Sequence, residues 1–320
     1  MRPWRPLFRR ALASAWIWSF FAATAMWLAT LVVARGQGGG QVLSAALAFS
    51  VFTVLVSLGQ MLVITAGPGN VDLSIPSVIA LCSAVSMLVM NERPALILPG
   101  LAAAVAAGAA VGAFNHGLIR LLRIPPIIAT LSSSLLVTSL AISVGRGLRI
   151  KPPAPFFDFV TARVAGVPLL ALLTVAFSVA VSVLVDRSRY GRALTALGQN
   201  ARAAHLAGVD VERTRLFTYL ASGALAGLTG ALIAGFAGGN SLDQGEEYLL
   251  LTIAVVVIGG TAVAGGRPTV AGVWGAALFM FLLVTMLNAA GAGAGLRMVL
   301  TGVIIIAVIT VAGGGKDPRP

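Results

Sequence analysis

Long runs of uncharged, mostly apolar residues make up most of the chain, and short charged segments separate them. Because about 20 apolar residues in a helix cross the hydrocarbon core of a bilayer, a run of at least 18 residues predicts one membrane-spanning helix. The sequence contains none of the alternating ten-residue segments that a membrane β-barrel requires. We therefore expect an all-α, polytopic transmembrane bundle of about ten helices. The uncharged runs are 11–34, 36–71, 73–91, 94–119, 124–145, 164–185, 216–242, 248–266, 268–296 and 298–315.

The composition agrees with this pattern. Hydrophobic residues make up 58% of the 320 residues and charged residues only 10%, whereas about a quarter of the residues in a soluble domain are charged. The net charge of +12 could indicate a nucleic-acid partner. The basic residues lie at the ends of the uncharged runs, however, where they orient helices and meet anionic lipid headgroups. We expect membrane lipid and no nucleic acid as a partner.

The distribution of Lys and Arg predicts how the chain is oriented. If the N-terminus is cytoplasmic, fifteen of the 22 basic residues lie on the cytoplasmic side, as the positive-inside rule requires. Both termini are then cytoplasmic. We expect a cytoplasmic N-terminal segment over 1–13, one transmembrane domain over 14–313 with a cytoplasmic loop at about 187–212, and a cytoplasmic tail over 314–320.

Three segments interrupt the apolar pattern. The segment 186–215 carries six arginines, and its two helix-forming stretches suggest that a soluble partner docks there. The segment 67–77 is rich in Gly and Pro, and there Asp72 or Ser74 can cap the next helix, with Pro76 in its first turn. The segment 259–268 contains four glycines. In the predicted topology all three lie on the cytoplasmic side.

Other singled-out residues have structural interpretations. Gln60, Asn115 and Asn288 are expected to form hydrogen bonds between helices, with solute contact as the alternative. Small residues four positions apart let two helices approach closely. Gly223, Gly227 and Gly230 are therefore expected to mark close helix packing.

The sequence does not indicate an enzyme. Its two histidines are far apart, its single cysteine lies within an uncharged run, and no paired acids, metal ligands or activated nucleophile are found. It also lacks the Gly-x-x-x-x-Gly-Lys-Ser/Thr phosphate loop. We expect no cofactor in this chain and no ATP hydrolysis by it.

Four stretches in chain order resemble the ribose/xylose/galactose-type permease family of ATP-binding-cassette (ABC) importers. Gly69-Asn70-Val71-Asp72-Leu73-Ser74-Ile75-Pro76-Ser77 is similar to the family's "G-I-D-L-S-V-G-S". Ile127-Ile128-Ala129-Thr130-Leu131 is similar to its "F-I-A-T-L". Tyr190 to Asn200, continuing to Gly208-Val209, is similar to its "G-R-x-x-x-A-x-G-x-N-x-x-A-A-x-x-x-G-I" loop. Val257 to Gly266 is similar to its "V-L-G-G-T-S-L-A-G-G".

The resemblance covers about 45–312 and implies the ABC importer permease fold in a multi-pass protein of the bacterial inner membrane. It implies three kinds of partner: a separate ABC ATPase subunit that binds the ATP, a periplasmic or extracellular solute-binding protein, and a second permease chain, identical or a sister. The solute would be a monosaccharide or a related polyol or nucleoside. Pro76 and the apparent insertion of Pro68 and Gly69 depart from the family pattern and leave its identity open.

The resemblance also implies roles for individual residues. Those expected to couple to the ATPase are Gly191, Arg192, Gly198, Asn200, Ala203, Ala204 and Gly208. Those expected in the translocation path or its gate are Asn70, Asp72, Ser74, Gly259, Gly260 and Thr261. The alternative function is an ion-coupled secondary transporter, which commonly places ionisable residues near the middle of the membrane. Asp72 is the deepest candidate for such a residue.

Overall fold

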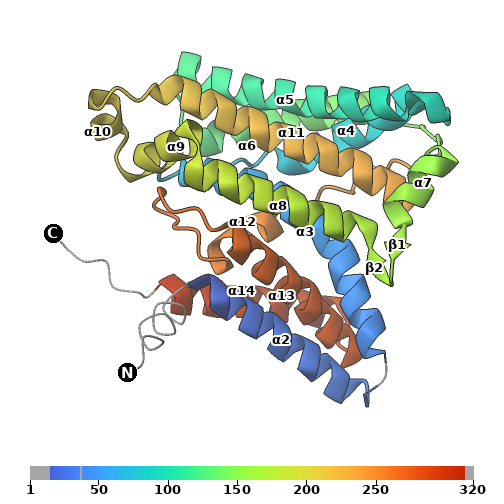
Figure 1. The fold of residues 1–320 in the computed structure, drawn as a ribbon. Coiled ribbons are helices and arrows are strands. Elements are labelled where there is room, and N and C mark those ends of the chain that lie inside the picture. The colour runs from blue at the N-terminus through green and yellow to red at the C-terminus, as the bar shows by residue number, and fades with distance from the viewer. Residues whose placement is uncertain (1–14, 37, 314–320) are drawn as a thin grey trace, which may run out of the picture.

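The computed structural model describes residues 15–36 and 38–313 and is almost entirely helical (Figure 1). The expected segments 1–13 and 314–320 lie outside the described residues. The helices are α2 (Ala15–Val33), α3 (Gly39–Thr65), α4 (Ile75–Met90), the 3-10 helix η1 (Pro94–Leu96), α5 (Ile97–Leu122), α6 (Pro126–Gly145), α7 (Ala154–Thr161), α8 (Leu169–Arg187), α9 (Arg189–Gln199), α10 (Ala201–Leu206), α11 (Val211–Ala237), α12 (Tyr248–Ile258), α13 (Val270–Ala289) and α14 (Ala294–Gly313). Strands β1 (Arg163–Val164) and β2 (Val167–Pro168) form one antiparallel pair.

Each of the ten uncharged runs contains one apolar helix, which confirms the all-α polytopic bundle. By length and composition, seven helices among the described residues can cross a membrane: α2, α3, α5 with η1, α6, α8, α11 and α13. The expectation of one full crossing per run is wrong for α4 and α12. They have 16 and 11 residues, and a helix of 11 residues is only about 16 Å long. The Gly- and Pro-rich segments beside them shorten these two helices.

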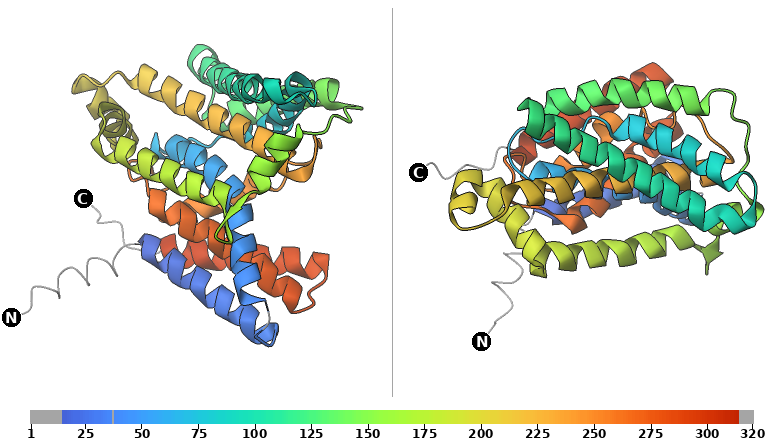
Figure 2. Two further views of the ribbon diagram at one scale, coloured as in Figure 1. Left: turned by 45° about the vertical axis from the view of Figure 1, so that its right-hand side comes forward. Right: turned by 90° about the horizontal axis from the view of Figure 1, so that it is seen from above.

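The long helices run roughly side by side, and the elements outside them gather at two opposite ends (Figure 1). The helices α9 and α10 lie at one end, together with the start of α2 and the end of α14. The helix α7 and the strand pair lie at the other end. Figure 2 shows from two further directions that α9 and α10 project from the bundle. Which end is cytoplasmic stays a prediction from the charge distribution.

Contacts at glycine bring α5 and α11 together over most of their length. A Cβ atom built on Gly108 would overlap the carbonyl oxygen of Gly223, and one built on Gly223 would overlap that of Gly108. Gly112 meets the carbonyl oxygen of Tyr219 in the same way, and Gly227 meets the backbone at Ala104. In lipid, helices associate through such close contacts because no hydrophobic force drives them together. The prediction of close packing at Gly223 and Gly227 is confirmed.

The segment after α6, which contains α7 and the two strands, covers one end of the bundle. Phe156 of α7 is buried, and its ring meets Gly235 of α11, where a Cβ atom would approach ring atoms to 2.5 Å. Ser44 near the start of α3 donates a hydrogen bond to the carbonyl oxygen of Gly166, between the two strands. This segment therefore holds the ends of α3 and α11 together.

Replacing Gly112 with Ala is expected to destabilise the protein by about 1–3 kcal/mol, because the new methyl group has no room against α11. At Gly117, on the same helix, an added Cβ atom would have nothing within 4 Å. Gly117→Ala is therefore the control, and it should leave stability unchanged or raise it by up to about 1 kcal/mol through helix preference. The measurement is thermal unfolding in detergent. Equal melting temperatures of the two variants would contradict the packing argument.

Candidate functional site

Three segments that are far apart in the sequence meet through their backbones at one point, which we call the glycine junction (Thr65, Gly67, Gly198, Gly265 and Gly266). The N–H of Gly266 donates a hydrogen bond of 2.9 Å to the carbonyl oxygen of Thr65. A Cβ atom on Gly198 would overlap that same oxygen and the backbone of Gly266. A Cβ atom on Gly265 would lie 2.6 Å from the Cα atom of Gly67. The end of α3, the end of α9 and the turn between α12 and α13 are thus joined directly.

The backbone conformation of the junction also requires glycine. Gly67, Gly265 and Gly266 have φ angles of +132°, +91° and +73°, which L side chains rarely adopt. Gly260, with φ +91°, lies in the turn that leads into the junction. At the glycine junction both the lack of space and the positive φ angles exclude a side chain. The two Gly-rich segments of the sequence therefore have the same structural role. They let α9 contact the end of α3 and the turn between α12 and α13.

The predicted residues Gly259, Gly260 and Thr261 lie in this α12–α13 turn. Gly259 packs against the backbone of Gly272 in α13, where a Cβ atom would come within 2.6 Å. Thr261 is buried, and its hydroxyl has no hydrogen-bond partner among the described residues. The turn is therefore tightly packed at Gly259 and carries one unused polar group beside the junction.

Three consecutive helices begin at the α9–α10 end, each with a side-chain cap. Ser188 accepts a hydrogen bond from the N–H of Gly191 at the start of α9. Asn200 accepts one from the N–H of Ala203 at the start of α10. Asp210 accepts one from the N–H of Arg213 at the start of α11. Such caps satisfy N–H groups that the first turn leaves free, typically for about 1 kcal/mol. Asn200 thus fixes the bend between α9 and α10.

One face of α9 is pressed onto the bundle and the other is open. Gly191, Leu194, Leu197 and Gly198 are buried, and a Cβ atom on Gly191 would overlap the carbonyl oxygen of Val185 at the end of α8. The hydroxyl of Tyr190 bonds to that of Thr218 in α11 at 2.9 Å, and burial raises the pKa of the Tyr190 phenol. The buried face therefore ties α9 to α3, α8 and α11.

The open face of α9 borders a groove of about 420 Å³. Arg192 lines this groove, and its guanidinium donates to the carbonyl oxygen of Arg187 at 2.9 Å. Asp186 and Pro268 line other parts of it. A second groove, of about 590 Å³, lies between α10 and the first turn of α11 and is lined by Arg202, His205 and Arg215 among others. Two open grooves with charged edges thus flank α9 and α10.

Gly208 ends α10 in a Schellman motif. It has φ +84°, its N–H donates to the carbonyl oxygen of His205, and the N–H of Val209 donates to that of Ala204. These two bonds satisfy the last carbonyl groups of the helix, and the left-handed angle favours glycine at this position. Ala204 is buried and Ala203 is exposed. The sequence pattern around Gly208 is therefore explained by the helix end.

Leu206 is a candidate that the sequence analysis missed. Its side chain is 81% exposed, in a segment that carries arginines on both sides. It lies between Ala204, which is buried, and the Gly208 turn. A single exposed leucine is not by itself evidence of an interface, but this one lies on the projecting α9–α10 end beside the groove lined by His205 and Gly208. Its position at the end of a predicted helix-forming stretch was the only signal in the sequence.

A buried polar node lies in the turn between α3 and α4; it comprises Gln60, Asp72, Ser74, Asn115 and Ser222. One carboxylate oxygen of Asp72 accepts from the N–H of Ser74 at 3.0 Å and from its hydroxyl at 2.6 Å. The other accepts from the hydroxyl of Ser222 in α11 at 2.9 Å. The amide of Asn115 donates to the Ser74 hydroxyl at 2.8 Å, and Gln60 accepts from the N–H of Asp72 at 3.2 Å. The node joins α3, α4, α5 and α11.

The prediction that Asp72 or Ser74 caps α4 needs correction. Ser74 is the N-cap residue and Pro76 lies in the first turn, as expected, but no side chain caps the helix. The Ser74 hydroxyl donates to Asp72 instead. The prediction of an interhelical hydrogen bond is confirmed for Asn115, which donates to the N-cap residue of α4, whereas Gln60 bonds to the backbone of the turn. Each keeps one fully buried polar atom, Gln60 Nε2 and Asn115 Oδ1, without a partner among the described residues.

The second motif also serves this turn. The hydroxyl of Thr130 in α6 accepts a hydrogen bond from the N–H of Leu73 at 3.1 Å, and it lies 3.1 Å from the carbonyl oxygen of Val71. Asn70 donates to the carbonyl oxygen of Gly67 and accepts from the hydroxyl of Tyr219 at 3.3 Å. Non-helical backbone within a membrane bundle needs such partners, because lipid offers none.

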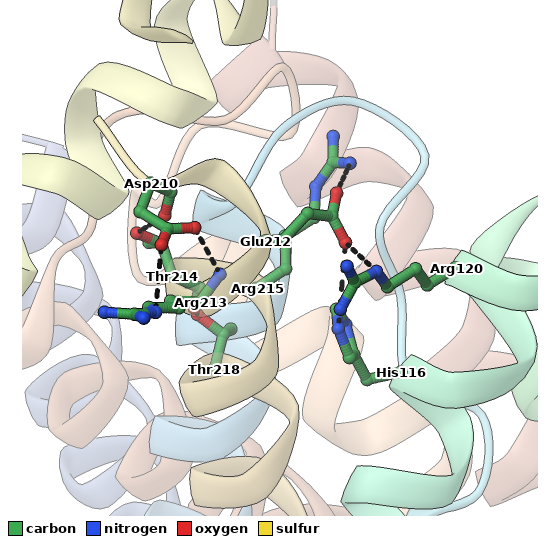
Figure 3. A network of polar contacts seen from close by, with 8 residues as sticks. All are labelled: His116, Arg120, Asp210, Glu212, Arg213, Thr214, Arg215 and Thr218. Carbon is green, nitrogen blue, oxygen red and sulfur yellow. Dashed lines mark hydrogen bonds and ion pairs between the residues drawn. The ribbon is translucent and has the colours of Figure 1, made fainter. Parts of the chain in front are cut away.

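An ionic cluster fastens the first turn of α11 to the last turns of α5 (Figure 3). The carboxylate of Glu212 lies 3.5 Å from Arg120 and 3.5 Å from Arg215, and 3.8 Å from the ring of His116. Arg120 is mostly exposed, so its ion pair contributes little. His116 is buried, and neither ring nitrogen forms a hydrogen bond within the described residues. The cluster orients the start of α11 beside the second groove.

The structure divides the predicted residues into two sets. Gly191, Gly198, Asn200 and Ala204 shape or anchor α9 and α10, and Arg192 and Ala203 face outward. Asn70, Asp72 and Ser74 lie in the turn that follows the junction. The junction joins the two sets, since Gly67 and Thr65 precede the turn directly. A force on α9 can therefore reach the polar node through adjoining backbone.

Comparisons with known proteins identify membrane permeases as the relatives of this chain. The sequence profile of the family described as "Branched-chain amino acid transport system / permease component" matches residues 42–309. The ribose import permease protein of Escherichia coli K12 is 31% identical over 80% of this chain and 81% of its own. A probable ABC transporter permease protein of Sinorhizobium fredii is 29% identical over 83% and 79%. The autoinducer 2 import permease of Salmonella typhi is 28% identical over 80% and 78%. No solved structure matches the chain significantly.

Replacing Ser222 with Ala should destabilise the protein by about 1–3 kcal/mol, because one oxygen of the buried Asp72 loses its donor. The matched control is Ser139→Ala in α6, where an exposed hydroxyl bonds only to its own helix at Leu135; that change should be nearly neutral. Thermal unfolding in detergent measures both. If Ser222→Ala unfolds at the same temperature as the control, the node does not hold α11 to the turn.

Proposed function

Because the chain belongs to this permease-component family and is the multi-pass permease subunit of an ABC importer in the bacterial inner membrane, we propose that it carries a small neutral sugar or polyol into the cell. The matches to importers of ribose and autoinducer 2 support this substrate class. The polar groups around the α3–α4 turn support it too. Apart from Asp72 they are hydroxyl and amide groups, which suit a solute that needs hydrogen bonds rather than counter-charges.

The energy for transport comes from ATP bound to a partner subunit. This chain is a transport subunit, and its sequence lacks a phosphate loop. We place the ATPase at α9 and α10, where the exposed Leu206 and the two grooves offer an apolar anchor between charged edges. The residues of this docking region are Gly191, Arg192, Gly198, Asn200, Ala203, Ala204 and Gly208.

The glycine junction transmits movement of α9 to the solute path. Gly198 contacts Thr65 and Gly266 without intervening side chains, so a displacement of α9 shifts the end of α3 and the α12–α13 turn together. The turns attached to them carry the proposed gate residues, which are Asn70, Asp72, Ser74, Gly259, Gly260 and Thr261. A solute-binding protein delivers the solute at the α7 end, and a second permease chain, identical or a sister, completes the path within the lipid.

The relatives favour an ATP-driven importer over an ion-coupled secondary transporter. Asp72, the deepest ionisable candidate for ion coupling, has its carboxylate oxygens engaged by Ser74 and Ser222. Through these hydrogen bonds Asp72 connects the α3–α4 turn to α11. The ion-coupled alternative therefore lacks a free carboxylate at that position.

The energy source can be tested with vesicles that contain the assembled importer. Uptake of a labelled sugar, with ribose first among a panel of neutral sugars, should require ATP on the ATPase side and should be insensitive to a proton uncoupler. Vesicles that carry a hydrolysis-deficient ATPase serve as the control. Uptake that continues without ATP and stops when the proton gradient collapses would overturn the proposal.

Leu206→Ala should weaken binding of the ATPase by about ten- to a hundredfold, since burial of a leucine at a contact contributes about 1.5–3 kcal/mol. Its matched control is Leu98→Ala, which changes a leucine of similar exposure in the first turn of α5. The ATPase retained on purified permease measures binding, and sugar uptake measures coupling. Equal retention by both variants would show that the ATPase does not contact Leu206.

Gly198→Ala should separate docking from coupling. The added methyl group overlaps Thr65 and Gly266, so the junction must open, whereas the outer faces of α9 and α10 are unchanged. We expect the ATPase to bind as it does to wild type while sugar uptake falls at least tenfold. Gly208→Ala is the comparison, because its cost is only the strain of a positive φ, about 1 kcal/mol. Wild-type uptake by Gly198→Ala would exclude the junction from coupling.

A further inference from the structure

The two short helices α4 and α12 begin at a common point inside the bundle. Gly245, just before α12, packs on the first turn of α4, where a Cβ atom would overlap the carbonyl oxygen of Pro76. The side chains of the N-cap residues Ser74 and Glu247 do not cap these helices. Neither side chain therefore satisfies the first N–H groups of these helices, although in α12 the N–H groups of Tyr248 and Leu249 bond to the carbonyl oxygens of Gly245 and Glu246. In transporters with interrupted helices, such starts lie beside the solute.

The segment 238–247 connects the end of α11 to this meeting point by returning into the bundle. On its way it reaches the middle of α4. The hydroxyl of Ser83 lies 2.9 Å from the side-chain oxygen of Asn240 and 2.9 Å from that of Gln244. Ser83 is fully buried and is the ninth residue of α4, about 12 Å from its start. A connection at the outer surface would not need contacts at this depth.

These three side chains have more hydrogen-bonding capacity than they use on one another. A serine hydroxyl has one hydrogen, so it can donate to only one of the two amide oxygens. The amide nitrogen of Asn240 has no partner among the described residues. Turning the amide over would leave its oxygen free instead. One donor or acceptor on Asn240 therefore remains unused in either orientation, and so does acceptor capacity on Gln244.

The cluster is polar, uncharged and reachable. Asn240 and Gln244 are half-buried, so they are open from one side, whereas Ser83 and its neighbour Ser86 are buried beneath them. Gln244 is held in place by a hydrogen bond of 3.0 Å from its amide to the carbonyl oxygen of Gly239. No Lys or Arg side chain bonds to Ser83, Asn240 or Gln244 within the described residues. The two side-chain amides offer both donors and acceptors and no charge. They can therefore bind the hydroxyl groups of a neutral, polyhydroxylated solute.

We propose that Ser83, Asn240 and Gln244 form a binding site for the transported solute, a neutral polyhydroxylated molecule, between the α7 end and the meeting point of α4 and α12. This inference rests on the proposed function and adds residues to it, since the gate residues lie beyond the start of α4. The exposed edges of Asn240 and Gln244 contact solute hydroxyl groups, and the Ser83 hydroxyl lies within hydrogen-bond distance beneath both amides.

The test uses the assembled importer in vesicles and the neutral sugar that the wild type takes up most efficiently from the panel. Asn240→Ala removes the amide with the unused group and should raise the KM for uptake about three- to tenfold, the loss of one hydrogen bond. The change should fall on the KM, and the maximal rate should change by less than the KM does. Ser139→Ala, an exposed hydroxyl on α6, is the control and should leave the KM unchanged.

A deoxy analogue of the sugar separates contact from a general disturbance. The analogue that lacks the hydroxyl bound by Asn240 should have a raised KM in the wild type and no further increase in the Asn240→Ala variant. A KM for Asn240→Ala equal to that of the wild type, with uptake intact, would overturn this inference alone. So would an equal, additive increase for every analogue. If the wild-type importer takes up none of the sugars, the proposed function is wrong and this inference falls with it.

Discussion

Close approach of one backbone to another is the interaction on which the rest of this structure depends. Between helices in lipid the hydrophobic effect gives little attraction, so contact depends on how near the backbones can come. Glycines supply that proximity along α5 and α11, and again at the junction of Gly198, Thr65 and Gly266. A methyl group at Gly198 or Gly112 would meet a carbonyl oxygen rather than a flexible side chain. These contacts are consequently stiff, so a movement of one helix can be transmitted directly to the helix or turn that it contacts.

The second constraint is that every buried backbone group needs a partner where helices are interrupted. Shortening α4 and α12 exposes such groups inside the bundle. Gln60 of α3, Thr130 of α6 and Asp72 of the turn itself satisfy those of the α3–α4 turn. Segment 238–247 brings Asn240 and Gln244 to Ser83 for a related reason. Interrupted helices, buried polar side chains and the proposed solute route therefore occur in the same part of the bundle. The interruptions leave backbone groups that need polar partners, and those polar groups can in turn bind a solute.

Much of the fold could be predicted from composition and spacing. Uncharged runs located the apolar helices, because transfer of a charge into lipid is costly whatever its neighbours are. Two of the three irregular segments were predicted to lie on the same side as the arginine-rich loop, and at the glycine junction they contact it. The lengths of α4 and α12 were not predicted, since an uncharged residue such as Thr261 or Leu73 fits a helix and a turn equally well.

The sequence by itself determined a helical membrane protein with an arginine-rich segment outside the apolar runs, because these features depend on local chemistry. Only the tertiary structure decided that Gly198 meets Thr65 and Gly266, that Asp72 is bound by Ser222, and that Asn240 reaches Ser83. The last of these pairs is 157 residues apart. Glycine and small polar residues are compatible with many neighbours, so the packing of the whole bundle selects which ones they meet.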